Sequence, residues 1–178
     1  MKKIMLISLV LFSTLGASGQ LVSPNRPVAV LNGRSGYVTV NEVTAGIGLS
    51  GTSTPFSTSY FGFTTMHGYQ ANKTFLLGAG TGLLFYDDGL LIPFYADLRV
   101  RLTQSWMSPY LAGAAGLLLN PSDIDSGTRM YLNPAVGLLY SLSRNLALNF
   151  SAGIHIQMAP NINRSSFLNT KFGLTYKL

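Results

Sequence analysis

Apolar and polar residues alternate along much of this chain with a period of two. The pattern is clearest over 90–102, where the apolar set is Leu90, Ile92, Phe94, Ala96, Leu98, Val100 and Leu102. The residues between them include Tyr95, Asp97, Arg99 and Arg101. Because successive side chains of a β-strand point to opposite faces, this stretch is predicted to be a strand with one apolar face and one polar face.

Similar segments recur along the chain and predict eight strands. Their expected ranges are 37–49, 59–69, 74–86, 90–102, 106–118, 129–141, 145–157 and 167–178. The range 106–118 carries the weakest signal, because residues 111–117 (LAGAAGL) do not alternate and also suit a helix. Most ranges match or slightly exceed the ~9–11 residues that a tilted membrane-spanning strand needs. We therefore expect an all-β fold, an eight-stranded antiparallel up-and-down transmembrane β-barrel.

The connections between these strands alternate in length. Those at 70–73, 103–105 and 141–145 are short, whereas 50–58, 120–128 and 158–165 are longer, with a tight turn at Asp87-Asp88 as the exception. This asymmetry is typical of outer-membrane barrels, in which the short turns are periplasmic. We expect the turn at Asp87-Asp88 to pair Tyr86 with Gly89. We expect the turn at 103–105 to pair Leu102 with Trp106, both facing outward.

The N-terminus has the pattern of a secretory signal peptide. Lys2 and Lys3 precede an apolar run over 4–12, and the small residues 17–19 (ASG) suit cleavage before Gln20. The apolar run is shorter than the ~20 residues of a transmembrane helix. The expected organisation is a signal peptide over 1–19, an irregular periplasmic leader over 20–36 and an outer-membrane barrel over 37–178.

Composition supports a membrane barrel and excludes several kinds of chemistry. Only 10% of residues are charged, against about 25% in soluble domains, and the mean hydropathy is +0.31. The absence of cysteine excludes a disulfide framework, a thiolate metal site and a cysteine nucleophile. The formal net charge of +6 falls to +4 without Lys2 and Lys3 (6 − 2). This excess suits acidic lipid headgroups and is too small and scattered to indicate nucleic-acid binding.

The apolar face is expected to meet lipid, because a charge at mid-depth there costs about 2–4 kcal/mol. The polar face then fills the lumen, which in an eight-stranded barrel is only wide enough for side chains. The expected lumen residues are Glu42, Asp97, Arg99, Arg101, Lys171 and His155. We interpret them as a packed structural core, with a narrow ion path as the alternative. Aromatic residues near strand ends are expected to form interfacial girdles: Tyr37, Tyr60, Tyr69, Phe85, Trp106, Tyr140 and Tyr176.

The last predicted strand alternates through Phe172, Leu174, Tyr176 and Leu178. With the export signal and the loop asymmetry, this pattern resembles the small eight-stranded outer-membrane barrels of Gram-negative bacteria, such as those of OmpA and OmpX. The resemblance implies that these four residues form the C-terminal signal read by the barrel-assembly machinery, although such signals commonly end in Phe. It also implies contact with outer-membrane lipid and lipopolysaccharide. It implies little about activity, because this fold carries many functions.

His155 is the main candidate for chemistry. The predicted hairpin around Leu142-Ser143-Arg144 places Tyr131 opposite it, and Ser151 lies on the same face. A lipid-modifying barrel enzyme would use a histidine with a serine and a carboxylate near the outer rim. The carboxylates expected near that rim lie in loops: Asp87, Asp88, Asp123 and Asp125. A hydrogen-bonded lumen histidine is the interpretation that we favour, and His67 is expected at the surface.

Other patterns give weaker signals. Residues 78–82 (GAGTG) lack the strand–turn–helix context of a nucleotide-binding loop. Asp87-Asp88 and residues 123–125 lack the ligand count of a calcium loop. No cofactor or metal is therefore expected. The favoured hypothesis is a non-enzymatic outer-membrane barrel with a structural or surface-interaction role. A secreted soluble barrel that binds an apolar ligand remains a third class, but it predicts charged outer faces.

Overall fold

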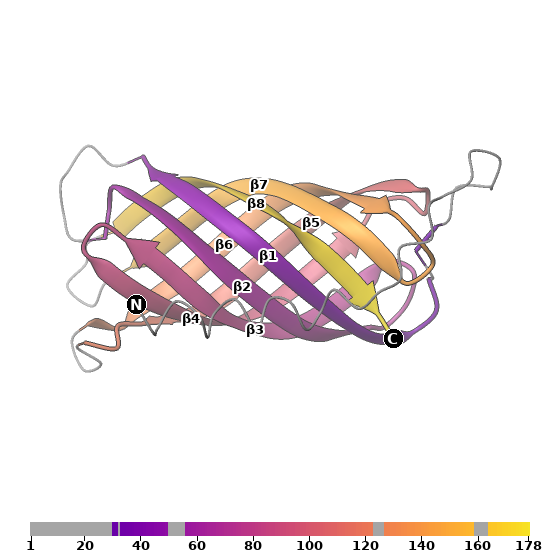
Figure 1. Ribbon diagram of the computed structural model, residues 1–178, viewed down its shortest axis with the longest axis horizontal. Helices are drawn as coiled ribbons and strands as arrows, with labels where there is room; N and C mark the ends of the chain where they lie inside the picture. The colour runs from indigo at the N-terminus through magenta and orange to yellow at the C-terminus, as the bar shows by residue number, and fades with distance from the viewer. Residues whose placement is uncertain (1–29, 32, 50–55, 123–126, 159–163) are drawn as a thin grey trace, which may run out of the picture.

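The chain forms a single closed antiparallel barrel in a computed structural model that describes residues 30–31, 33–49, 56–122, 127–158 and 164–178 (Figure 1). The strands are β1 (Gly36–Gly48), β2 (Ser59–Gln70), β3 (Phe75–Tyr86), β4 (Gly89–Arg101), β5 (Met107–Leu119), β6 (Arg129–Ser141), β7 (Leu146–Met158) and β8 (Arg164–Lys177). Each strand pairs with the next, and β8 pairs with β1. The expected eight-stranded up-and-down fold is confirmed.

Closure of the barrel removes the exposed edge that an open sheet would present. β1 pairs with β2 on one side and with β8 on the other, from Val38 opposite Lys177 to Gly48 opposite Phe167. Because lipid offers no hydrogen bonds, a membrane-spanning sheet needs every strand to be paired on both of its edges. Among the described residues there is no helix with the length and apolar character to cross a membrane.

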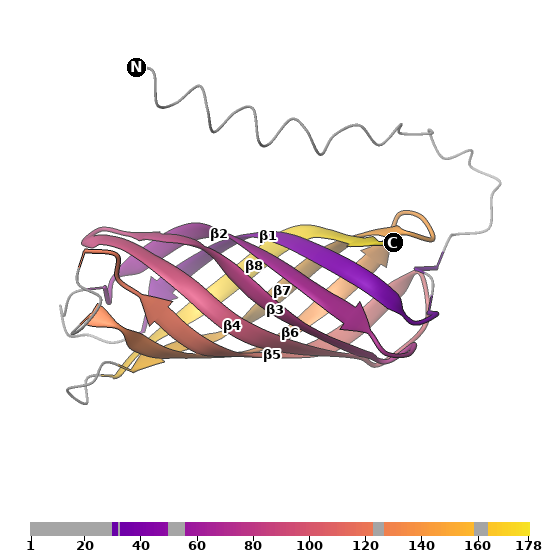
Figure 2. The same ribbon diagram turned by 90° about the horizontal axis from the view of Figure 1, so that it is seen from below.

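The two ends of the barrel differ in their connections. β1 starts and β8 finishes at the same end, which we call the terminal end (Figure 2). The turns at this end are 71–74, 102–106 and 142–145, and those at the opposite end, the far end, are 49–58, 87–88, 120–128 and 159–163. The predicted asymmetry is therefore present for the connections 49–58 and 120–128, whereas 87–88 is a tight turn and 159–163 has the same length as 102–106.

The outer surface of the strands is an apolar band. Its large exposed side chains include Phe61, Phe63, Leu77, Leu83, Phe94, Leu98, Leu111, Leu117, Val136, Phe150, Ile154, Leu168 and Phe172. On the described strands, charge reaches this face only at the far rim, where Arg164 begins β8. Hydrogen bonds within the sheet satisfy two outward polar groups, because Thr65 donates to Asn41 (2.9 Å) and the Tyr37 hydroxyl contacts His67 Nδ1 (2.6 Å). This surface is that of a transmembrane barrel.

Tyrosine rings in the lumen lie over glycines on neighbouring strands. A Cβ atom added at Gly46, Gly80 or Gly137 would collide with the ring of Tyr60, Tyr95 or Tyr110 respectively, and each glycine is paired with its tyrosine in the register. The missing side chain makes room for a ring that covers the bare backbone. The prediction that Tyr60 belongs to an interfacial girdle is therefore wrong, since its ring is buried inside the barrel.

β5 is a strand along its whole length, which resolves the ambiguity of 111–117. The predicted pairing of Leu102 with Trp106 is wrong: Arg101 pairs with Tyr110, and the Leu102 amide donates to the Pro109 carbonyl (2.9 Å). The cause is local, because the Ser108 hydroxyl donates to the Ser105 carbonyl (2.8 Å) and thereby fixes a longer turn. Tyr110 consequently faces the lumen, and every second residue of β5 counted from Tyr110 faces the lumen as well.

A charge placed on the middle of the apolar band should destabilise the barrel. Ala96 faces outward at mid-β4 and pairs with Ala79 and Ala115, so Ala96→Arg should lower the free energy of unfolding by about 2–4 kcal/mol. Urea unfolding in phospholipid vesicles measures the change, and Ala96→Leu serves as the size control. Equal stability of the two variants would contradict a lipid-facing position for Ala96.

Candidate functional site

An ion-paired group of buried side chains lies in the middle of the lumen. Arg99 Nη1 lies 2.9 Å from Glu42 Oε1, and Arg99 Nη2 lies 2.9 Å from Asp97 Oδ2. The Arg99 and Glu42 side chains are only 7% and 1% exposed. Two carboxylates therefore surround one guanidinium, which uses its fork of donors to bind both.

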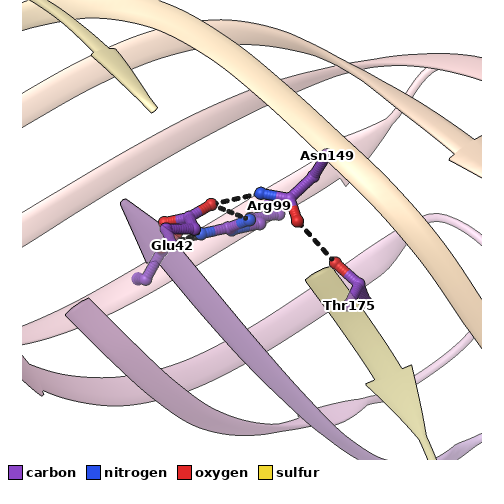
Figure 3. Close-up of polar contacts among 5 residues, drawn as sticks. Glu42, Arg99, Asn149 and Thr175 are labelled. Atoms are coloured by element: carbon purple, nitrogen blue, oxygen red, sulfur yellow. Dashed lines mark hydrogen bonds and ion pairs between the residues drawn. The ribbon is translucent and has the colours of Figure 1, made fainter. Parts of the chain in front are cut away.

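Amide and hydroxyl groups extend this arrangement across the barrel (Figure 3). Asn149 of β7 donates to Glu42 Oε1 (2.5 Å), and Thr175 of β8 donates to Asn149 Oδ1 (3.2 Å). Since Glu42 belongs to β1 and Arg99 to β4, the chain of contacts joins four strands through the lumen. We call Glu42, Asp97, Arg99, Asn149 and Thr175 the central network. It spans the lumen at mid-height, and among the described residues Asp97 Oδ1 is its one buried side-chain oxygen without a hydrogen-bond partner.

The other two predicted cationic lumen residues lie outside the central network. Lys171 is buried and faces the lumen opposite Thr44, where its positive charge attracts the Glu42 carboxylate. Arg101, the last residue of β4, is half-buried at the terminal end, and its Nη2 donates to Ser108 Oγ (3.2 Å). The predicted polar set is therefore distributed along the lumen, with ion pairing at its centre.

His155 lies in the far half of the lumen among aromatic rings. It is 1% exposed, and its Nδ1 is 2.9 Å from the Tyr60 hydroxyl. The Tyr131 ring packs against it at 4.9 Å although the register pairs Tyr131 with Gln157, two residues from the predicted position. Both positions keep the same face because the shift is even. No described carboxylate hydrogen-bonds to His155, so the arrangement lacks the third member of a catalytic triad.

Phe56 covers this aromatic cluster at the far end. Its amide donates to Asp88 Oδ2 (2.9 Å), and its carbonyl accepts from the Gln157 side chain. Its φ of 61° is the one positive value found at a described non-glycine residue. The ring packs on Tyr86, and the Arg129 guanidinium lies 4.9 Å from its centre. Contacts on both backbone groups hold Phe56 in this uncommon conformation, with its ring packed on the aromatic cluster at the far end; we call this residue the Phe56 lid.

Sequence reasoning placed Phe56 in a loop and missed this contact. No periodic signal marks it, because residue 56 lies outside the alternating segments. Of the far-end acids weighed for metal or catalytic roles, Asp88 instead binds the Phe56 backbone. Asp123 and Asp125 lie outside the described residues. Within the described part of the chain, no cluster of three or more His, Cys, Asp or Glu side chains has the arrangement of a metal site.

The predicted leader reaches the terminal end of the lumen. Leu31 is buried against Tyr110, Leu139 and Ala147, and its amide donates to Ser141 Oγ (3.0 Å). Residues 1–29, which include the predicted signal peptide, lie outside the described residues. The described part of the leader therefore enters the barrel mouth.

The residues of the predicted assembly signal lie on the outer face of β8. Phe172, Leu174, Tyr176 and Leu178 are all exposed. The intervening Lys171, Gly173, Thr175 and Lys177 face inward. This placement leaves the apolar side chains accessible from the membrane side.

Comparison with known proteins supports the fold. No protein-family model and no curated protein matches this chain. The solved Neisserial surface protein A is 21% identical, with a TM-score of 0.53 over 80% of this chain and 96% of that chain. The outer membrane protein OprG from Pseudomonas aeruginosa is 10% identical, with a TM-score of 0.50 over 86% of this chain and 99% of that chain. The predicted resemblance to small outer-membrane barrels is confirmed at the level of the fold.

Removal of Arg99 should destabilise the barrel strongly. Arg99→Met leaves Glu42 and Asp97 buried without their cation, and loss of one partner from such a pair typically costs about 3–5 kcal/mol. Urea unfolding in vesicles measures the loss. The triple variant Arg99→Met/Glu42→Gln/Asp97→Asn should recover part of it, since neutral amides are less costly to bury.

The matched control is Arg164→Met, which removes an exposed arginine at the far rim and should change stability by no more than about 0.5 kcal/mol. An Arg99→Met variant as stable as this control would argue against a structural role for the central network.

Proposed function

We propose that this protein is an integral outer-membrane barrel with a structural or surface-interaction role, a filled lumen and no general pore activity. The observation that carries the proposal is the central network, in which Arg99 binds Glu42 across the lumen and Asp97 on its own strand, each at 2.9 Å. The Phe56 lid closes the far end above it. A continuous water path would have to break charge-assisted hydrogen bonds that are costly to leave unmade.

The proposed orientation places the terminal end in the periplasm and the far end at the cell surface, because short turns are periplasmic in such barrels. Interaction with a partner would then use the connections 49–58, 120–128 and 159–163. The outward band would contact outer-membrane lipid, with lipopolysaccharide at the far rim. A partner of these connections would therefore approach from outside the cell.

The second candidate is a lipid-modifying barrel enzyme centred on His155. One observation favours it, because His155 Nε2 is buried and lacks a hydrogen-bond partner among the described residues. Two features weigh against it: the Phe56 lid covers the cluster, and Nδ1 contacts a tyrosine hydroxyl, not a carboxylate. Analysis of outer-membrane lipid from cells that express wild type or His155→Ala separates the two. Loss of a lipid modification in a folded His155→Ala barrel would favour the enzyme.

The proposed filling of the lumen predicts an absence of stable conductance. In planar lipid bilayers the wild-type protein should give no sustained channel openings at any salt concentration, because its mid-lumen is occupied by paired side chains. A general porin inserted into the same bilayer provides the positive control. Sustained, reproducible openings by the wild type, lost on replacement of the lumen cations, would support the narrow ion path instead.

The outward residues of β8 should matter for assembly. We propose that Phe172, Leu174, Tyr176 and Leu178 are recognised by the barrel-assembly machinery. The double variant Tyr176→Ala/Phe172→Ala should reduce the amount of folded barrel in the outer membrane. Folded barrel is measured as the band that migrates faster on gels when the sample is not boiled. A control pair, Phe94→Ala/Phe150→Ala, removes two exposed outward rings from other strands and should assemble normally. An equal assembly defect in both pairs would point to lost lipid contact, not recognition.

A further inference from the structure

Side-chain charge is balanced in two regions of the barrel and unbalanced in the third. The lumen holds equal numbers of acids and cations: Glu42, Asp97, Arg99 and Lys171. The described far end also holds equal numbers of acids and cations: Asp87, Asp88, Arg129 and Arg164. The terminal end carries cations without a described acidic side chain: Arg34, Lys73, Arg101, Arg144 and Lys177. The excess positive charge of the described residues is therefore concentrated at one mouth.

Four of these cations line one open cavity. The cavity has a volume of about 470 Å³, and Arg34, Lys73, Arg101 and Arg144 contribute to its wall together with Gln104. They come from the segment before β1, the β2–β3 turn, the end of β4 and the β6–β7 turn. Contacts with the barrel hold part of this wall in place, because Lys177 Nζ donates to the Arg34 carbonyl and to Gln70 Oε1 (3.1 Å).

Arg101 has hydrogen-bonding capacity left over at this site. Its Nη2 donates to Ser108, but its Nε and Nη1 are buried and have no partner among the described residues. Because both nitrogens are shielded from solvent, Arg101 contributes its positive charge to the cavity wall and not these two donors. Arginine presents paired donors that match phosphate oxygens, and lysine adds a compact positive charge.

We propose that the cationic mouth at the terminal end binds a phosphate-bearing anion. A cleft lined by charges of one sign concentrates ions of the opposite sign, and the described wall of this mouth has no acidic side chain to compete. The cavity of about 470 Å³ has room for a ligand with several phosphate groups. The same chemistry is offered by a soluble polyphosphate and by the headgroup of an anionic phospholipid in the adjoining leaflet.

Calorimetry on protein extracted in a zwitterionic detergent tests the proposal, with sodium tripolyphosphate as the soluble probe. The wild type should bind it, and binding should weaken as NaCl rises from about 0.05 M to about 0.5 M because salt screens the cations. The double variant Lys73→Gln/Arg144→Gln should weaken binding by about fivefold or more, since two of the four lining charges are lost.

Both substituted residues are exposed in turns, so the barrel should remain folded, which gel mobility before and after boiling verifies. The matched control is Arg164→Gln, which removes an exposed arginine at the far end and should leave the affinity unchanged. A second arm adds phosphatidylglycerol or phosphatidylcholine to the micelles. Competition by phosphatidylglycerol alone identifies a lipid headgroup as a ligand, whereas no competition identifies a soluble anion.

The proposal is wrong if the wild type binds neither tripolyphosphate nor phosphatidylglycerol. It is also wrong if the folded double variant binds as tightly as the wild type, or if Arg164→Gln weakens binding to the same extent. The single variants Lys73→Gln and Arg144→Gln keep the test valid if the double variant fails to assemble.

Discussion

The structure depends on one constraint, the need to hydrogen-bond every backbone group of a sheet surrounded by lipid. Closure of β8 onto β1 meets this need, and it fixes an inside and an outside for every strand. Once the faces are fixed, each polar residue must either point inward or find a bond within the sheet, as Thr65 does with Asn41. The inward polar groups then have to satisfy one another, and Arg99 between Glu42 and Asp97 is the centre of that solution.

The alternation of residues was sufficient to predict the barrel and the face on which most lumen residues lie. It placed Arg99 on the inner face because Leu98 and Val100 flank it, and it placed Glu42 there because Glu42 is out of phase with the apolar set that starts at Val43. It did not predict the ion pair between Glu42 and Arg99. Contact across the lumen depends on strand tilt and register, and the alternation of apolar and polar residues determines neither. The pairing at the β4–β5 turn failed for a related reason, since serine hydroxyl groups determine the length of that turn.

The features that sequence reasoning missed lie where periodicity ends. Phe56 follows a long connection and reaches back over the lumen, held through its own backbone by Asp88 and Gln157. Leu31 enters the other mouth from a segment without alternation. Tyr60 was assigned to a girdle from its position near a strand end, although its parity placed it inside. The ends of the barrel are thus shaped by individual contacts, whereas its wall is shaped by the repeating pattern.

The tyrosine–glycine pairs of the lumen impose a rule on how this barrel can diverge. A larger residue at Gly46 cannot be accommodated while Tyr60 keeps its ring, and loss of that ring leaves bare backbone beside a void. Substitution at either position alone is therefore disfavoured, and drift of the lumen should proceed through paired exchanges across neighbouring strands. On the described outer face such coupling is confined to polar pairs such as Thr65 with Asn41, so in related chains the apolar residues that meet lipid should vary one at a time while the tyrosine–glycine pairs of the interior change together.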